Sequence, residues 1–353
     1  MADISTIDKN LQIAEAFGRD DIVLRDVRNA PFAIRGVFYE GDRFRRMPKA
    51  IAETVNDGVL HLSAHTSGGR VFFSTDSECI ALTCTRPEFW AMGHMARTGN
   101  GGFTLYERRG GRWVYRATFV PPATAKGFSS VVDLGGKDMR ELMLQMPLYA
   151  PISSLLVGIS DGSELRSCET LYTREKPVVF YGSSITQGGC ASSAGSDYAG
   201  RVSRYFDTDY INLGFSGSAK GESTMMGYIA GLEMSCFVYD YDYNAPDAEH
   251  LERTHYRGYR TVREAQPELP IIMMSSPNYD RIGGDMPKRR NVIAASYEKA
   301  LASGDKNVYF IDGAEVFTTF NTDECTVDGI HPNDLGFWRM AEAVKDVLEK
   351  IFI

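Results

Sequence analysis

The sequence predicts a two-domain protein in which an antiparallel, jelly-roll-like β-sandwich precedes an α/β domain with a five-stranded parallel sheet. The chain has 353 residues, more than twice the length of a typical domain. Runs rich in β-branched and aromatic residues dominate before residue 160, whereas strands alternate with helices after residue 175. A polar stretch over residues 163–176 separates these patterns. We therefore place the β-sandwich in residues 1–170 and the α/β domain in residues 171–353.

The N-terminal half contains short apolar runs separated by Gly, Asp, Asn and Ser, a pattern typical of an antiparallel sandwich. We expect the residues before position 32 to form a short helix and a lead-in. The expected strands cover residues 32–39, 58–64, 70–77, 79–85, 102–108, 112–120 and 153–159.

The C-terminal half alternates buried apolar strands with longer helical segments. This alternation indicates a parallel sheet that is covered by helices on both faces. The expected strands cover residues 176–182, 209–214, 235–243, 269–276 and 307–313, and the expected helices lie near residues 197–206, 248–265, 287–303 and 333–349.

The charge of the chain excludes some classes of partner. Lys and Arg number 38 and Asp and Glu number 46, so the formal net charge is −8. Nucleic acids and anionic membranes are bound through basic patches, so we expect neither as a partner. No stretch approaches the about 20 apolar residues of a membrane-spanning helix. The N-terminal residues show no signal peptide, so we expect a cytoplasmic protein, although a leader already removed would leave no trace.

The cysteines show no CxxC spacing. Cys79 and Cys84 lie five positions apart in one expected strand, so their side chains point to opposite faces and cannot readily pair. We expect reduced thiols, as in a reducing compartment. The six cysteines are Cys79, Cys84, Cys168, Cys190, Cys236 and Cys325.

A serine-containing turn follows the first strand of the expected parallel sheet, in the sequence Gly182-Ser183-Ser184. Doubly wound sheets bind their ligands beyond the C-terminal ends of the strands. On such a turn Ser184 can expose its hydroxyl near backbone N–H donors. A turn without chemistry is an equally good interpretation of this segment alone, because Ser and Gly are common in turns.

A second segment, running from Asp328 to His331, lies just before the last expected helix. A serine hydroxyl needs a general base, and the base needs a carboxylate that holds its tautomer. Asp328 and His331 are three positions apart on a bent loop and can supply both. A loop histidine beside a capping aspartate would be the more common explanation of this pair alone.

Two further segments contain donors that an acyl-transfer reaction requires. Residues 212–218, which include Gly217, follow the second strand, and Asn244 follows the third. A backbone N–H and a side-chain amide at adjacent strand ends could stabilise a developing oxyanion. Taken singly, these segments are also explained as a plain turn and the start of a helix.

In this order, the four segments GSSITQG, NLGFSG, DYN and DGIHP resemble the sequence blocks of the SGNH (GDSL-type) hydrolases. The resemblance covers the whole C-terminal half. It implies that Ser184 is the nucleophile, that His331 is the base and that Asp328 orients it. It also implies an oxyanion hole formed by the N–H of Ser184, by Gly217 and by Asn244. The family further implies a flavodoxin-like strand order and neither a metal nor an organic cofactor.

The sequence departs from the family pattern at two positions. Ser183 stands where the usual Gly-Asp-Ser has aspartate. The longer string GSSITQGGCASSAG resembles a subgroup with serine there, whose members have an N-terminal β-sandwich with a Gly-x-Asp-Leu-Tyr motif. Residues 102–106 match this motif except at Thr104, which puts any role of the motif's carboxylate in doubt. Leu105 and Tyr106 are equally well explained as ordinary strand residues.

Other histidines and basic residues favour structural roles. His61 and His65 would lie about 13 Å apart on a strand, too far to share a metal. The spacing of His250 and His255 is not that of a zinc site. The basic residues between Arg281 and Arg290 indicate a solvated loop and helix start, with a contribution to substrate binding as the alternative.

The sandwich also contains aromatic residues that could stack on a sugar. They are more commonly used for core or interface packing. The candidates are Trp90, Tyr106, Trp113 and Tyr115.

The resemblance implies a serine esterase that hydrolyses short-chain esters, acetyl esters above all, on a carbohydrate. The expected partner is therefore a small-molecule or oligosaccharide ester, and a homo-oligomer is compatible with the sequence. Two alternatives stay open. The protein could be a catalytically silent carbohydrate-binding protein, or an acyltransferase that uses the same triad.

Overall fold

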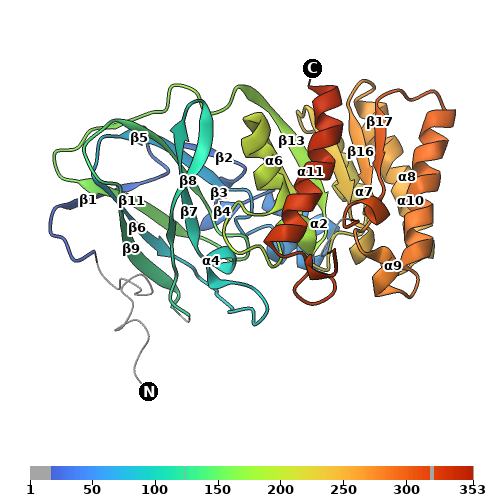
Figure 1. Ribbon diagram of the computed structural model, residues 1–353, viewed down its shortest axis with the longest axis horizontal. Helices are drawn as coiled ribbons and strands as arrows, with labels where there is room; N and C mark the ends of the chain where they lie inside the picture. The colour runs from blue at the N-terminus through green and yellow to red at the C-terminus, as the bar shows by residue number, and fades with distance from the viewer. Residues whose placement is uncertain (1–16, 124, 319–321, 353) are drawn as a thin grey trace.

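The computed structural model describes residues 17–123, 125–318 and 322–352, and places two differently built regions side by side (Figure 1). Antiparallel sheets form the N-terminal region, and a parallel sheet with flanking helices forms the C-terminal region. The change of topology falls between β12 (Leu165–Arg166) and β13 (Arg174–Gly182). The division at residue 170 lies in this interval and stays a prediction. Within the described residues, no helix is long and apolar enough to cross a membrane.

The N-terminal region is built mainly from two antiparallel sheets with apolar side chains between them, and β3 and β4 pair as a separate two-stranded sheet. One sheet has the order β1-β11-β6-β9 and the other β12-β5-β10-β7-β8, with β2 also paired to β5. Side chains such as Phe73, Leu82, Leu105 and Val157 form the core of this region, and burying each contributes about 1.5–3 kcal/mol. The strands are β1 (Ile22–Asp26), β2 (Ala33–Arg35), β3 (Phe38–Glu40), β4 (Arg43–Arg45), β5 (Arg70–Thr75), β6 (Cys79–Thr85), β7 (Phe103–Arg109), β8 (Arg112–Phe119), β9 (Gly127–Asp133), β10 (Arg140–Gln145) and β11 (Ser154–Ser160).

One prediction for this region was wrong. The expected strand at 58–64 is helix α3 (Asp57–Leu62), which follows α2 (Lys49–Val55). Asn56 caps α3 by accepting a hydrogen bond from the N–H of Val59 at 2.9 Å, and Val59 and Leu62 lie on its buried face at helical spacing. Before residue 32 we expected a short helix and a lead-in; the described residues there include β1 at Ile22–Asp26, which pairs with β11, and the helix stays a prediction. Residues 1–16 lie outside the described part of the chain.

The C-terminal region confirms the predicted parallel sheet. Its strand order is β14-β13-β15-β16-β17, so the first strand lies inside the sheet, as in flavodoxin-like folds. Helices α6 and α11 cover one face, and α7, α8 and α10 cover the other. The remaining elements are β14 (Thr208–Gly214), β15 (Cys236–Asp240), β16 (Ile271–Met274), β17 (Val308–Ile311), α4 (Arg97–Asn100), α5 (Ser184–Gln187), α6 (Tyr198–Phe206), α7 (Ser223–Ala230), α8 (Ala248–Ala265), α9 (Tyr279–Ile282), α10 (Met286–Ala302) and α11 (Asp334–Ile351).

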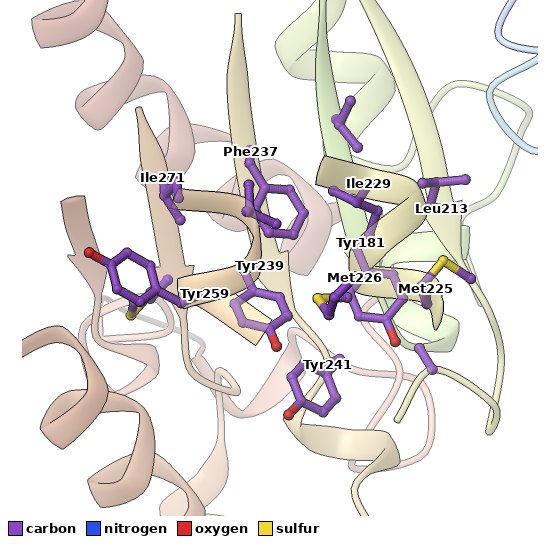
Figure 2. Close-up of a cluster of buried hydrophobic side chains, with 14 of the residues drawn as sticks. Tyr181, Leu213, Met225, Met226, Ile229, Phe237, Tyr239, Tyr241, Tyr259 and Ile271 are labelled. Atoms are coloured by element: carbon purple, nitrogen blue, oxygen red, sulfur yellow. The ribbon is translucent and has the colours of Figure 1, made fainter. Parts of the chain in front are cut away.

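One face of the parallel sheet has a core rich in tyrosine and methionine (Figure 2). The rings of Tyr239 and Tyr241 have centroids 5.1 Å apart, and Met225 and Met226 of α7 pack in the same cluster. A buried phenol needs a hydrogen-bond partner. Tyr181 finds one by accepting from the N–H of Gly221 at 3.0 Å. This contact holds the segment that leads from the end of β14 into α7.

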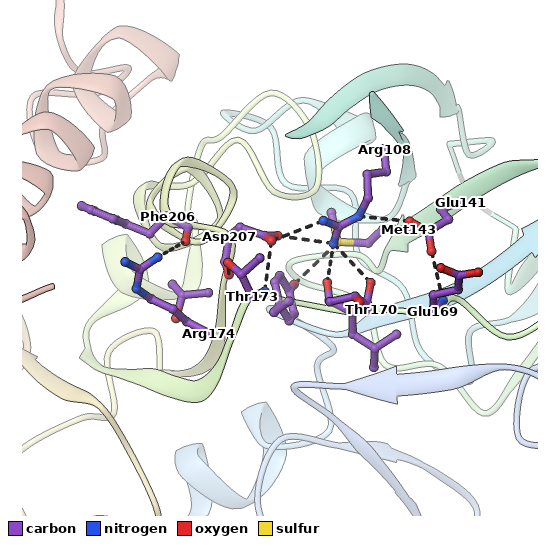
Figure 3. A network of polar contacts seen from close by, with 12 residues as sticks. Arg108, Glu141, Met143, Glu169, Thr170, Thr173, Arg174, Phe206 and Asp207 are labelled. Atoms are coloured by element: carbon purple, nitrogen blue, oxygen red, sulfur yellow. Dashed lines mark hydrogen bonds and ion pairs between the residues drawn. The ribbon is translucent and has the colours of Figure 1, made fainter. Parts of the chain in front are cut away.

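Buried polar contacts join the two regions. Figure 3 shows Arg108 of β7, whose guanidinium lies 3.3 Å from the carboxylate of Asp207 and donates to the carbonyl of Leu171 at 2.8 Å. Arg70 of β5 is fully buried and donates to Asp209 at 2.9 Å and to the carbonyl of Tyr210 at 2.7 Å. Breaking a buried ion pair by removing one partner typically costs about 3–5 kcal/mol. These contacts therefore hold the sandwich in a defined position against the parallel sheet.

Candidate active site

Ser184 lies at the C-terminal end of β13, on the turn that opens helix α5. Ser183 caps this helix by accepting a hydrogen bond from the N–H of Ile185 at 3.1 Å. Serine and aspartate are both good N-caps, so Ser183 preserves the capping role that an aspartate would have there. Gly182 is required, since a Cβ at this position would lie 2.0 Å from the carbonyl oxygen of Asp240. Ser184 itself retains 9% exposure.

The structure brings Ser184, His331 and Asp328 into one chain of hydrogen bonds. The Ser184 Oγ lies 2.9 Å from Nε2 of His331. The Nδ1 of the same ring lies 2.7 Å from Oδ2 of Asp328. This arrangement matches the geometry in which a carboxylate orients an imidazole toward a serine hydroxyl.

The carboxylate of Asp328 is held in its charged form by the loop that contains it. Partial burial acts to raise its pKa, but the N–H groups of His331 and Ile330 and the imidazole lower it to about 2. These N–H groups donate to Oδ1 at 2.7 and 3.0 Å. Asn278 donates to the carbonyl of Gly329 at 2.9 Å and fixes the bend of the loop.

The expected oxyanion residues lie at the ends of the strands beside β13. Gly182 pairs in register with Gly214 of β14 and with Asp240 of β15, so the three strands end together. Gly217 follows with a φ of +65°, a conformation that favours glycine. Asn244 donates from its amide nitrogen to the carbonyl of Phe215 at 2.8 Å. An amide nitrogen has two hydrogens, so this bond orients Asn244 and leaves the second hydrogen for a ligand.

Gln187 links the turn that contains Ser184 to its neighbours, a role that the sequence analysis did not assign. Its side-chain oxygen accepts from the N–H of Ser216 at 3.1 Å, and its amide nitrogen donates to the carbonyl of Leu148 in the sandwich at 3.3 Å. Its backbone carbonyl accepts from the hydroxyl of Ser67 at 2.7 Å. The only feature of the sequence that could have pointed to this role is the position of Gln187 three residues after Ser184 in GSSITQG.

Arg46 of the sandwich holds the end of β14 and Phe215, where the loop of residues 215–221 that contains Gly217 (the Gly217 loop) begins, and the sequence analysis did not assign it this role either. Its Nη1 donates to the carbonyls of Gly214 at 2.6 Å and Asn212 at 3.0 Å, and its guanidinium lies 4.6 Å from the ring centre of Phe215. The side chain is buried, and this burial lowers its pKa to about 9. Nothing in the local sequence distinguishes Arg46 from the neighbouring Arg45.

Arg289 departs from the interpretation of the basic cluster as a solvated loop and helix start, whereas Arg281 and Lys288 are exposed as expected. Its side chain is buried and donates to the carbonyls of Asp242 at 2.8 Å and Ala245 at 2.6 Å. It also lies 2.8 Å from the carboxylate of Asp285. Arg289 therefore holds the short segment that contains Asn244.

Two segments of the sandwich lie beside the turn that contains Ser184 and beside His331. Tyr149 donates from its hydroxyl to the backbone carbonyl of Ser184 at 3.1 Å. In the segment between β6 and α4, the ring of His94 has its centre 5.7 Å from that of His331. Trp90 of the same segment is 63% exposed and lies 5.9 Å from the ring of His61.

The predicted separation of His61 and His65 was wrong. Their ring centres lie 5.2 Å apart, because His61 is on a helix rather than a strand. His65 is buried, which lowers its pKa to about 3, so it is neutral at ordinary pH.

The motif at residues 102–106 lies on β7, against the parallel-sheet region. Thr104 is fully buried and pairs in register with Gln145. Tyr106 is buried beneath the guanidinium of Arg204, 4.5 Å from its ring centre. Trp113 is also buried, against Phe72. These aromatic residues are therefore used in packing, whereas Tyr115 and Trp90 are exposed.

Sequence models of known protein families match both regions of the chain. Residues 175–349 match the sequence model of the GDSL-like lipase/acylhydrolase family, and residues 22–165 match a model described as the N-terminus of SGNH-hydrolase-type esterases. No match was found among curated protein sequences.

Solved structures with the same fold cover nearly the whole chain. A protein from Bacteroides ovatus, described as a GDSL-like lipase, is 29% identical over 94% of this chain and 98% of its own, with a TM-score of 0.85. The salicylyl-acyltransferase SsfX3 from a tetracycline biosynthetic pathway is 18% identical, and the match covers 95% of this chain and 99% of the acyltransferase, with a TM-score of 0.76. A family two carbohydrate esterase from Clostridium thermocellum is 14% identical, and the match covers 91% of this chain and 98% of the esterase, with a TM-score of 0.61.

A β-sandwich followed by a flavodoxin-like sheet, with both regions matched by esterase models, defines an SGNH-type ester hydrolase. The chain belongs to the GDSL-like lipase/acylhydrolase family.

Proposed function

We propose that the protein cleaves esters through a triad of Ser184, His331 and Asp328. The 2.9 Å contact between Ser184 Oγ and His331 Nε2 carries this proposal. Ser184 attacks the ester carbonyl while His331 takes its proton, and Asp328 stabilises the imidazolium that forms. His331 then returns the proton to the leaving alcohol. Water, activated by the same histidine, releases the acid and regenerates Ser184.

The negative charge on the tetrahedral intermediate needs donors that are already in place. We assign this role to the N–H groups of Ser184 and Gly217 and to the side-chain amide of Asn244. The hydrogen bond from Asn244 to Phe215 supports the assignment, because it connects the Asn244 segment to the Gly217 loop. Arg46 and Arg289 hold the backbone of these two segments through carbonyl contacts.

Replacing the nucleophile tests the reaction class directly. Ser184→Ala should lower kcat for p-nitrophenyl acetate by about 10⁶-fold, while thermal unfolding stays close to that of the wild type. Ser192→Ala, an exposed serine of the same loop, should leave activity unchanged. A fluorophosphonate probe should label the wild type and not Ser184→Ala. Retained turnover and labelling in Ser184→Ala would overturn the proposal, and a wild type without adduct would favour a silent binding protein.

We further propose a short acyl group on a carbohydrate as the substrate. The exposed Trp90 lies beside His61 of α3, and the two rings form an aromatic surface on the sandwich. The segment that contains Trp90 also places His94 beside His331. Exposed aromatic rings suit stacking on a sugar face. Among the structural neighbours are an acetyl xylan esterase and a family two carbohydrate esterase in complex with cellohexaose.

The role of Trp90 is testable with two substrates. Trp90→Ala should raise KM for acetylated xylo-oligosaccharides by about tenfold, as expected for the loss of about 1.4 kcal/mol of stacking, and leave KM for p-nitrophenyl acetate unchanged. Trp338→Ala, an exposed tryptophan on α11, is the matched control. If Trp90→Ala has the same KM for acetylated xylo-oligosaccharides as the wild type, sugar binding at this surface is contradicted. Acyl transfer to an added sugar in preference to water would instead identify an acyltransferase.

A further inference from the structure

A cluster of potential metal ligands from three separate segments meets at the proposed catalytic histidine. His94, Cys190 and His331 each offer one ligand atom, and these atoms all lie within 4.8 Å of one another. His94 comes from the sandwich, Cys190 follows the nucleophile turn, and His331 belongs to the loop before α11. Local sequence spacing does not indicate this cluster, because the three residues are far apart along the chain.

The donor set of this cluster selects a particular class of cation. Two imidazoles and one thiolate suit Zn²⁺, whereas Mg²⁺ and Ca²⁺ prefer oxygen ligands. Zinc bonds to nitrogen and sulfur are about 2.0–2.3 Å long, so the ligand atoms must move somewhat closer together. His94 is exposed and can turn its ring without disturbing the core. Three protein ligands leave a fourth position for water.

Cys190 is placed where a thiol is unusual. It is buried and has a φ of +74°, a backbone conformation that residues other than glycine rarely adopt. Burial raises the pKa of its thiol to about 11, so the thiol is protonated at neutral pH. Metal binding would release this proton to solvent, because the thiolate is the ligand.

Both ring nitrogens of His331 are already used in the hydrogen-bonded chain. Nε2 contacts Ser184 at 2.9 Å and Nδ1 contacts Asp328 at 2.7 Å. A metal ion on either nitrogen must therefore displace one of these partners. Displacing Ser184 removes its general base, and displacing Asp328 removes the group that orients the base.

We propose that His94, Cys190 and His331 form a zinc site whose occupation switches the esterase off. The inhibitory part rests on the proposed catalytic role of His331, whereas the binding part does not. The switch is reversible, since a chelator that removes the ion restores the contact between Ser184 and His331. The sandwich takes part in this control because it supplies His94.

Metal binding can be measured without any enzymatic activity. Co²⁺ added to Ser184→Ala should give the near-ultraviolet thiolate-to-cobalt charge-transfer band, and Zn²⁺ should displace it. The band should disappear in Cys190→Ser on the same background, and the affinity should fall at least about tenfold in His94→Asn. Cys168→Ser, a thiol of the sandwich, should retain the band. A band that persists in Cys190→Ser, or none in any variant, overturns the site.

Inhibition is measured on the wild-type serine. Zn²⁺ should abolish hydrolysis of p-nitrophenyl acetate, EDTA should restore it, and Mg²⁺ should have no effect. In Cys190→Gly, which suits the positive φ, and in His94→Asn, the Zn²⁺ concentration for half-inhibition should rise at least about tenfold. His250→Asn should behave like the wild type. Unchanged half-inhibition in both variants overturns the switch. If the wild type hydrolyses no ester yet shows the cobalt band, the proposed function fails and the metal site stands.

Discussion

The two parts of the candidate site are supported by different regions of the molecule. The hydrogen bonds that join Ser184, His331 and Asp328 lie entirely within the C-terminal region. The end of β14, which leads into the loop that contains Gly217, is instead held from the sandwich, by Arg46 through the carbonyls of Asn212 and Gly214. The side-chain contacts of the proposed triad therefore lie within the α/β fold, whereas the strand end that leads to the proposed oxyanion donors is also held by the packing of the two regions.

This difference gives the sandwich a mechanical role apart from any sugar binding. Gln187 extends the connection, because it contacts both Ser216 beside Gly217 and Leu148 of the sandwich. An isolated α/β domain would lose the hydrogen bonds from Arg46 to the end of β14 and the acceptor that Leu148 offers to Gln187. Substitutions on the two sides should accordingly differ in what they change.

Asp328→Asn should give the largest effect among substitutions outside the nucleophile. The amide can still accept from the N–H groups of His331 and Ile330, but it presents a donor to Nδ1 and favours the wrong tautomer. We expect kcat to fall by about 10³–10⁴-fold with little change in unfolding temperature, measured with p-nitrophenyl acetate. A loss below tenfold would remove Asp328 from the triad.

The same substitution should alter the acid stability of the protein. The pKa of Asp328 is lowered from 3.8 to about 2 on folding. Its contribution to stability is therefore present above about pH 4 and is lost as the pH falls toward 2. Urea unfolding of the wild type should weaken through this window more steeply than that of Asp328→Asn. Identical pH profiles would mean that the loop does not hold the charged carboxylate.

Asn244→Ala should weaken stabilisation of the tetrahedral intermediate without disturbing the contacts between Ser184, His331 and Asp328. Loss of one donor to the intermediate should reduce kcat by about 10²–10³-fold, with KM nearly unchanged. Asn291→Ala, a substitution on α10, is the control and should retain full activity. If KM rises while kcat stays constant, Asn244 binds the ground state and is no oxyanion donor.

Arg46→Met tests the dependence on the sandwich. Removing the guanidinium leaves buried carbonyls without donors, so we expect a loss of about 3 kcal/mol in the free energy of unfolding and about a tenfold fall in kcat. Arg45→Met is the matched control, since Arg45 contacts Ser63 and Glu40 within the sandwich. Its kcat should be unchanged. Equal kcat values for both variants would show that the Gly217 loop is held by its own region.

Tyr149→Phe should have the smallest effect. Its hydroxyl donates to the carbonyl of Ser184, which also accepts from the N–H groups of Gly188 at 3.1 Å and Gly189 at 2.7 Å. Loss of one of three donors should cost about 1 kcal/mol of stability and reduce kcat only a few-fold. A hundredfold fall in kcat would indicate that the phenol takes part in the reaction.

Strand and helix positions in the C-terminal region were largely predictable, because buried parallel strands and amphipathic helices have distinct periodicities. The prediction for α8 matches its bounds, Ala248–Ala265. In the N-terminal region the run VLHL suggested a strand, yet α3 forms because Asn56 caps it and its apolar residues face the neighbouring region. Short apolar runs fit both periods, and only tertiary contacts decide between them.

The sequence by itself determined the order of the four segments proposed to form the active site, the two-region architecture and the residue types at each strand end. These depend on local patterns and on the rule that parallel strands end at one edge of a sheet. Only the tertiary structure decided that Arg46 and Gln187 hold the Gly217 loop and that His94 and Cys190 approach His331. Such contacts join residues distant in the chain, and their geometry arises from packing between regions, which no local sequence pattern encodes.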